Sequence, residues 1–170
     1  MNFEQSKLDI EQWIINFVEK PNPLLNNWPP CPYARQARLN KKVDIRSGGF
    51  NPIDDLKQVN MGEFEVLAYV YDCKQWSAAE FNELVETVNV SYLAQRGLIA
   101  LADHPDDAEL VNGVAMNQGT YAIVFVQELA KLNHFAKILA GKGFYNGWPE
   151  EYLTVLFNGR EDPRHDISVC

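Results

Sequence analysis

The order of the elements predicted after residue 64 constrains the fold of this chain most. Apolar residues alternate in the first of them, as in a strand, and Ser77 with Glu80 forms a capping box at the start of the next, a helix. The predicted order is strand, helix, strand, strand, helix, strand, at 64–71, 77–97, 98–102, 121–126, from 129 to Gly141 or Gly143, and 152–157. This is the order of the ferredoxin-like sandwich, in which two helices cover one face of a sheet. We therefore predict an α+β fold with a ferredoxin-like βαββαβ core at about residues 64–158.

The first 60 residues are predicted to form a helical and irregular extension that packs on this core. An amphipathic helix is expected from about Ser6 to Glu19, and a short one from Pro32 to about Leu39. A short strand is expected at 43–46. At 170 residues and 46% hydrophobic content the chain suits a single domain, 1–170, with a frayed tail at 160–170.

Charge and cysteine content exclude several classes of protein. The net charge of −8 disfavours binding to nucleic acid or to an anionic membrane surface, because both repel an acidic protein. No apolar stretch approaches the roughly 18 residues of a membrane span. The three cysteines have no metal-type spacing, and an odd number without a leader peptide indicates free thiols and a cytoplasmic protein.

A cluster of carboxylates and one histidine follows the predicted strand at 98–102. His104, Asp106, Asp107 and Glu109 lie within six positions, where a rigid strand end can direct several side chains at one point. Histidine and carboxylate side chains bind divalent metals and serve as general acids and bases. The alternative is that the aspartates cap a turn and that His104 lies on the surface.

The segment His104-Pro-Asp-Asp107 behind an apolar strand resembles the motif of zinc-dependent N-acetylglucosaminyl deacetylases. The resemblance implies a divalent-metal-dependent hydrolase in which His104 and Asp107 bind the metal and Asp106 activates water. It covers about a dozen residues. The glycines that follow the motif in that family are replaced here by residues 111–114.

A second candidate site surrounds Cys31. A cysteine just ahead of a helix meets the positive end of the helix dipole, and Arg35 and Arg38 would further favour its thiolate, so Cys31 is a candidate nucleophile. The alternative is an inert packed thiol. The two arginines belong to a basic stretch at 35–46 that either binds phosphate or carboxylate groups or is a solvated face.

A longer resemblance covers about residues 10–110. An uncharacterised bacterial family, a domain of unknown function, has a helix containing Trp, then a Cys-Pro-Phe-Ala segment with a basic residue after it, and an apolar strand ending in His-Pro. Trp13, Cys31-Pro-Tyr-Ala-Arg35 and the stretch 98–105 are similar in order, although Pro30 stands where that family prefers Leu. The resemblance implies no activity, but it suggests that Cys31 and His104 face one pocket.

Aromatic residues supply the remaining candidates. The loop 144–149 contains Trp148, which with Tyr33, Arg35 and Arg38 is predicted to contact a ligand. Tyr69 and Tyr71 lie on a predicted strand, and a second subunit could bury them in a homodimer formed through the sheet face.

Three functions remain open from the sequence. The first is a small enzyme or a protein that binds a small molecule, with its pocket between Cys31 and the loop 104–109, and with Cys31, His104 and Asp106 as catalytic residues. The second is a non-catalytic interaction or assembly protein. The third is the metal-dependent hydrolase.

Overall fold

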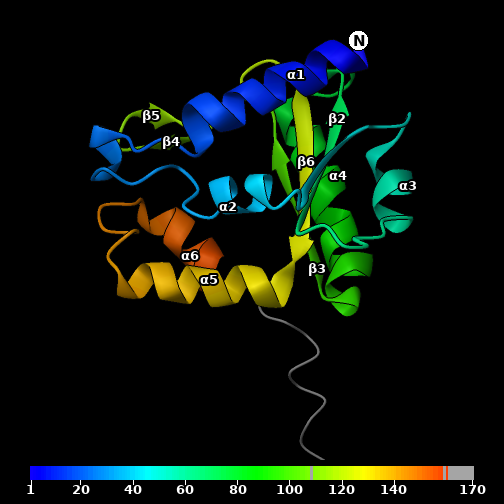
Figure 1. The fold of residues 1–170 in the computed structure, drawn as a ribbon. Coiled ribbons are helices and arrows are strands. Elements are labelled where there is room, and N and C mark those ends of the chain that lie inside the picture. Colours follow the sequence, from blue (N-terminus) through cyan, green and yellow to red (C-terminus); the bar gives the residue numbers. More distant parts are fainter. Residues whose placement is uncertain (108, 159, 161–170) are drawn as a thin grey trace, which may run out of the picture.

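The computed structural model describes residues 1–107, 109–158 and 160 and shows an α+β fold built on a four-stranded sheet (Figure 1). The strands of this sheet are β1 (Val43–Ser47), β2 (Val66–Tyr71), β3 (Leu98–Asp103) and β6 (Ala122–Glu128). The strands β4 (Leu110–Val111) and β5 (Val114–Ala115) form a separate small hairpin. The α-helices are α1 (Phe3–Trp13), α2 (Ala34–Leu39), α3 (Pro52–Lys57), α4 (Ala78–Val88), α5 (Leu129–Gly141) and α6 (Glu150–Asn158). The π-helical turns are η1 (Ile14–Val18) and η4 (Asn89–Leu93), and the 3-10 turns are η2 (Pro23–Leu25), η3 (Cys73–Gln75) and η5 (Ala94–Arg96).

The sheet contains the split βαβ unit that the sequence predicts. β6 lies between β2 and β3 and is antiparallel to both, and α4 connects β2 to β3. The predicted capping box is present at the start of α4, where Ser77 and Glu80 bond to each other's backbone N–H. β1 joins the outer side of β2 and runs parallel to it, so the N-terminal segment supplies one edge of the sheet.

The strand predicted at 152–157 is wrong, because these residues belong to α6. Pro149, Glu150 and Glu151 favour a helix start, and Tyr152, Val155 and Leu156 have helical spacing. The place beside β2 that the last strand of a ferredoxin-like core would take is held by β1. The chain therefore has the α+β class with three of the predicted strands of this core in the expected order, and its complete βαββαβ topology is not formed.

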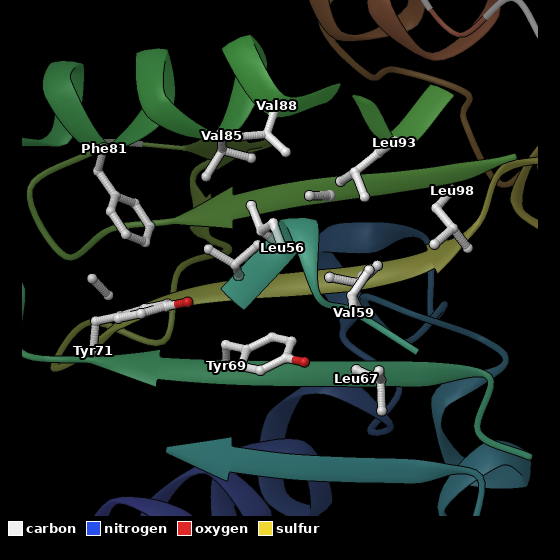
Figure 2. Packing of buried hydrophobic residues seen from close by; sticks show 14 of the residues in the cluster. Leu56, Val59, Leu67, Tyr69, Tyr71, Phe81, Val85, Val88, Leu93 and Leu98 are labelled. Carbon is white, nitrogen blue, oxygen red and sulfur yellow. The ribbon is translucent and has the colours of Figure 1, made fainter. Parts of the chain in front are cut away.

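One face of the sheet is covered by α3 and α4, and this layer holds the larger hydrophobic core (Figure 2). Phe81, Val85 and Val88 of α4 face the sheet, and Leu56 of α3 packs beside them. Tyr69 and Tyr71 lie under these helices and are 7% and 2% exposed. Because α3 and α4 of the same chain bury both tyrosines, these two residues offer no exposed surface for the predicted homodimer.

The opposite face is covered by the N-terminal helix. Ile10 of α1 and Ile14 of η1 pack on Ile45, Ala68, Val70 and Ile123. The predicted helix at 6–19 thus begins earlier, at Phe3, and its last part is the π-helical turn η1. Because both sheet faces are covered, Leu67 to Tyr71 are all buried, which hides the alternation expected of a half-exposed strand.

Candidate functional site

A cavity of about 380 Å³ lies between the second face of the sheet, the segment around Cys31 and the helices α5 and α6. Its walls come from elements far apart in the chain, including η1, α2, the ends of β2 and β6, and the aromatic loop before α6. In Figure 1 the helices α2, α5 and α6 lie to one side of the sheet, with α1 above them and α5 lowest. Most of the wall is apolar, and its apolar side chains include Trp13, Phe125, Leu132, Phe135, Leu139 and Phe144.

Aromatic contacts hold the wall in place. Trp13 stacks on Phe125 of β6 with 6.3 Å between the ring centroids. Tyr33, just before α2, packs against Phe135 of α5 at 4.2 Å. Trp148 packs against Phe144 at 5.3 Å. Tyr33 and Trp148, which the sequence predicts as ligand contacts, therefore both border the cavity, and their role in binding stays a prediction.

The polar side chains that border the cavity include those of Cys31, Tyr33, Tyr145 and Arg160, and those of Glu65, Gln127, Glu128 and Lys131. Burial raises the pKa of Tyr145; the charge of Arg160 lowers it, and Cys31 and Tyr33 raise it further. These charge effects fit the place of all four groups on the wall of one cavity. Asn133 Nδ2 donates a hydrogen bond of 2.8 Å to the backbone oxygen of Arg160 and so ties this residue to α5.

The surroundings of Cys31 favour the thiol and not the thiolate. Burial raises the pKa of Cys31, and hydrogen bonds from the backbone N–H groups of Tyr33 and Ala34 offset this only in part. The predicted help from arginines is absent, because Arg38 binds Glu19 through two hydrogen bonds of 2.8 and 2.9 Å and Arg35 is exposed. Cys31 is therefore protonated at neutral pH and poorly suited to act as a nucleophile.

We expect Cys31 to react slowly with a thiol reagent in the folded protein. In a chain whose other two cysteines are replaced by serine, alkylation at pH 7.5 should be at least tenfold slower than for the same chain in denaturant, because both the thiolate fraction and access are reduced. Mass spectrometry of timed samples gives the rate. Equal rates in the folded and unfolded chain would show that burial does not govern this thiol.

The basic stretch at 35–46 is largely engaged in ion pairs. Besides Arg38 with Glu19, Lys42 lies 3.6 Å from Glu63, and Arg46 lies 2.8 Å from Asp44. This pattern supports the solvated-face interpretation over a phosphate site. The ligand-binding role predicted for Arg35 and Arg38 stays a prediction, since neither residue borders the cavity.

His104 lies directly after β3 and is fully buried. Its Nε2 lies 3.2 Å from the backbone oxygen of Cys73 and 3.1 Å from that of Trp76, so Nε2 carries the proton and donates. Its Nδ1 accepts a hydrogen bond from the N–H of Asp106 at 3.2 Å. Both ring nitrogens are thus used inside the protein, and His104 holds the end of β3 against η3.

The carboxylates of this loop do not converge on His104. The side chain of Asp106 is 84% exposed, and Asp107 accepts a hydrogen bond of 2.8 Å from Asn82 of α4. Among residues 1–107, 109–158 and 160 no three His, Cys, Asp or Glu side chains form a group that could hold a metal ion. The divalent-metal site with His104 and Asp107, and the role of Asp106 as a base, stay predictions that these contacts do not support.

Asp103, the last residue of β3, is the carboxylate with the most altered surroundings in this region. Burial raises its pKa from 3.8 to about 6, although the N–H of Gln118 donates to it at 3.0 Å and Asn117 donates at 3.4 Å. The sequence pattern does not distinguish it from its acidic neighbours. Its burial depends on the long loop before β6, which folds back over the strand end.

Asp103 should make stability depend on pH. Because its pKa is higher in the folded than in the unfolded chain, folding favours the protonated form, and that contribution is complete below about pH 4 and lost as pH rises to about 6. We expect Asp103→Asn to gain stability relative to the natural chain over this interval, by up to about 3 kcal/mol. Urea unfolding at half-unit steps from pH 4 to 7 measures the difference, and a difference that does not change with pH would refute the assignment.

The structure does not bring Cys31 and His104 into one pocket. The ring of His104 packs 5.9 Å from that of Phe81, in the layer beneath α4, whereas Cys31 borders the cavity on the face that carries Phe125. Successive residues of β6 point to opposite faces, so the sheet separates the two surroundings. Within the loop after β3, the charge of Glu109 acts on Arg160, which links this loop to the cavity.

Tyr145 and Arg160, which border the cavity, were not among the predicted site residues. Tyr145 lies in the aromatic loop 144–149, whose composition was a usable signal, but the sequence pointed to Trp148 instead. Arg160 fell in the predicted frayed tail, and nothing in its neighbourhood in the sequence indicates a site. The rest of that tail, including Cys170, lies outside the described residues.

Comparisons of the chain with protein-family models, with curated proteins and with solved structures found no match. In the part of the chain that the structure describes, no helix is long and apolar enough to cross a membrane.

Proposed function

We propose that this protein binds a small, largely apolar molecule in the cavity between η1, the Cys31 segment, α5 and α6. The observation that carries the proposal is the cavity itself, whose volume of about 380 Å³ falls in the range of small-molecule sites and whose wall is mostly apolar with a few polar groups.

The arrangement of the wall supports binding. Large aromatic and aliphatic side chains from segments far apart in the chain face the space, and an apolar ligand would remove their surfaces from water. The contacts of Trp13 with Phe125 and of Tyr33 with Phe135 hold part of the wall before any ligand arrives, which lowers the cost of binding.

The chemistry at hand favours binding over catalysis. Cys31 is protonated at neutral pH, and His104, the predicted partner of Cys31, uses both ring nitrogens in hydrogen bonds elsewhere. The proposal therefore keeps the ligand-binding half of the first function considered from the sequence. In the proposed pocket, the side opposite Cys31 is formed by α5, α6 and Tyr145, and not by the loop 104–109 as the sequence predicted.

Binding of N-phenyl-1-naphthylamine, an uncharged probe that fluoresces in apolar surroundings, tests this proposal. We expect saturable one-to-one binding, with energy transfer from Trp13 and Trp148 because both border the cavity. Ala136→Phe places a ring in the space from α5 and should weaken binding at least tenfold. Ala130→Phe, at an exposed position of the same helix, should leave binding unchanged.

The two variants also guard against a trivial result. Thermal unfolding of each variant shows whether it is folded, since a loosened core would bind the probe unspecifically. Leu132→Trp fills the same space from another position of α5 and serves if Ala136→Phe does not fold. A folded Ala136→Phe or Leu132→Trp protein that binds the probe as well as the natural chain does would overturn the proposal.

A further inference from the structure

We infer that the molecule bound in this cavity carries a single carboxylate, and that Arg160 binds this group while the apolar wall holds the remainder. The inference rests on the proposed function and names the class of ligand. It starts from a cation at an otherwise apolar site.

The side chain of Arg160 borders the cavity and lacks partners there. Within residues 1–107, 109–158 and 160, its Nε is buried and has no hydrogen-bond partner, and no carboxylate lies within ion-pair distance of the guanidinium. A buried N–H of a cation that has no acceptor is unfavourable, and a ligand carboxylate would supply the acceptor together with a second, parallel charge-assisted hydrogen bond.

The other charged groups at the cavity do not replace such a ligand. Lys131 Nζ binds Glu128 Oε1 at 3.3 Å, so this pair is neutral as a unit. Glu65 is exposed. Burial lowers the pKa of Arg160 and the charge of Glu109 offsets this only in part; Glu109 does not border the cavity and is not in ion-pair contact with Arg160. Among the described residues, no acceptor therefore occupies the guanidinium, and it is available to an anion.

The surroundings of Arg160 select a monoanion. Among residues 1–107, 109–158 and 160 the cavity offers one unpaired cation, since Lys131 is engaged, and a doubly charged phosphate would keep one charge uncompensated in apolar surroundings. Tyr145, close to Arg160, keeps its phenolic proton and can donate it to a carboxylate oxygen. The aromatic and aliphatic wall then accommodates an alkyl or aryl chain.

Displacement of N-phenyl-1-naphthylamine by a matched pair of ligands tests the inference. Decanoate and 1-decanol share a chain length and differ in the head group. Below the micelle-forming concentration at pH 7.5, we expect decanoate to displace half of the probe from the natural chain at a concentration at least tenfold lower than 1-decanol requires.

Variants assign the preference to Arg160. Arg160→Gln should reduce the preference to less than threefold and leave displacement by 1-decanol unchanged. Lys131→Gln, which removes another cation at the cavity, should retain the full preference. Thermal unfolding confirms that each variant is folded, and Arg160→Lys keeps the charge if the glutamine variant does not fold.

The outcomes separate the two proposals. Equal displacement by decanoate and 1-decanol would overturn the carboxylate inference and leave the apolar binding site standing. A preference that persists in Arg160→Gln would overturn the assignment to this residue. Absence of binding by the probe and by both ligands would overturn the proposed function itself.

Discussion

Replacing His104 with leucine is expected to lower the free energy of unfolding by about 3 kcal/mol, because the imidazole is a buried structural group. The substitution leaves the backbone oxygens of Cys73 and Trp76 without their donor and the N–H of Asp106 without its acceptor. Each buried polar group that loses its partner costs about 1–3 kcal/mol. Urea unfolding followed by tryptophan fluorescence measures the change.

Asp106→Ala provides the matched control in the same loop. Its side chain is 84% exposed and lies 4.0 Å from His104 Nδ1, so its removal should change stability by less than about 0.5 kcal/mol. A stable His104→Leu protein would show that the observed hydrogen bonds contribute little. In that case the structural role of His104 would be wrong, and the predicted catalytic role would explain the residue better.

Gly48→Ala should destabilise the protein by about 3 kcal/mol, because there is no room for a methyl group at this position. A Cβ atom on Gly48 would lie 2.1 Å from Cε1 of Tyr71. The ring cannot move aside easily, since Trp76 and Phe81 pack against it, each at 5.9 Å between ring centroids, and its hydroxyl donates to Asp55 at 2.9 Å. Chemical denaturation gives the loss directly.

Two further variants test the cause of that loss. Gly141→Ala, at the end of α5 where no atom lies within 4 Å of the added carbon, should be neutral or slightly stabilising. In a Tyr71→Leu background, Gly48→Ala should cost much less than in the natural chain, because the clashing ring is gone. Additive effects of the two substitutions would contradict the steric explanation.

Much of the fold follows from local patterns in the sequence. The capping box at Ser77 and the apolar spacing of α4 and α5 are properties of single segments, and local sequence is sufficient to predict them. The run 152–157 is too short for periodicity to separate strand from helix, and it was assigned wrongly. The helix α3 was missed because six residues offer few repeats.

The candidate site was harder to predict because its residues meet only in the folded chain. The sequence singled out Cys31, Tyr33 and Trp148, which border the cavity, and His104, which does not. Residue type alone does not tell a buried histidine held by backbone oxygens from one that meets a substrate. For Arg160, the relevant fact is its place beside α5, and that depends on the path of the whole C-terminal segment.

The central position of β6 has a consequence for how the protein is made. β2 and β3 leave the ribosome well before residues 122–128, yet both need β6 as their common neighbour. Until that strand is synthesised, each presents an unpaired apolar edge to the cell interior. We therefore expect nascent chains that stall before residue 122 to be prone to aggregation and to need chaperones.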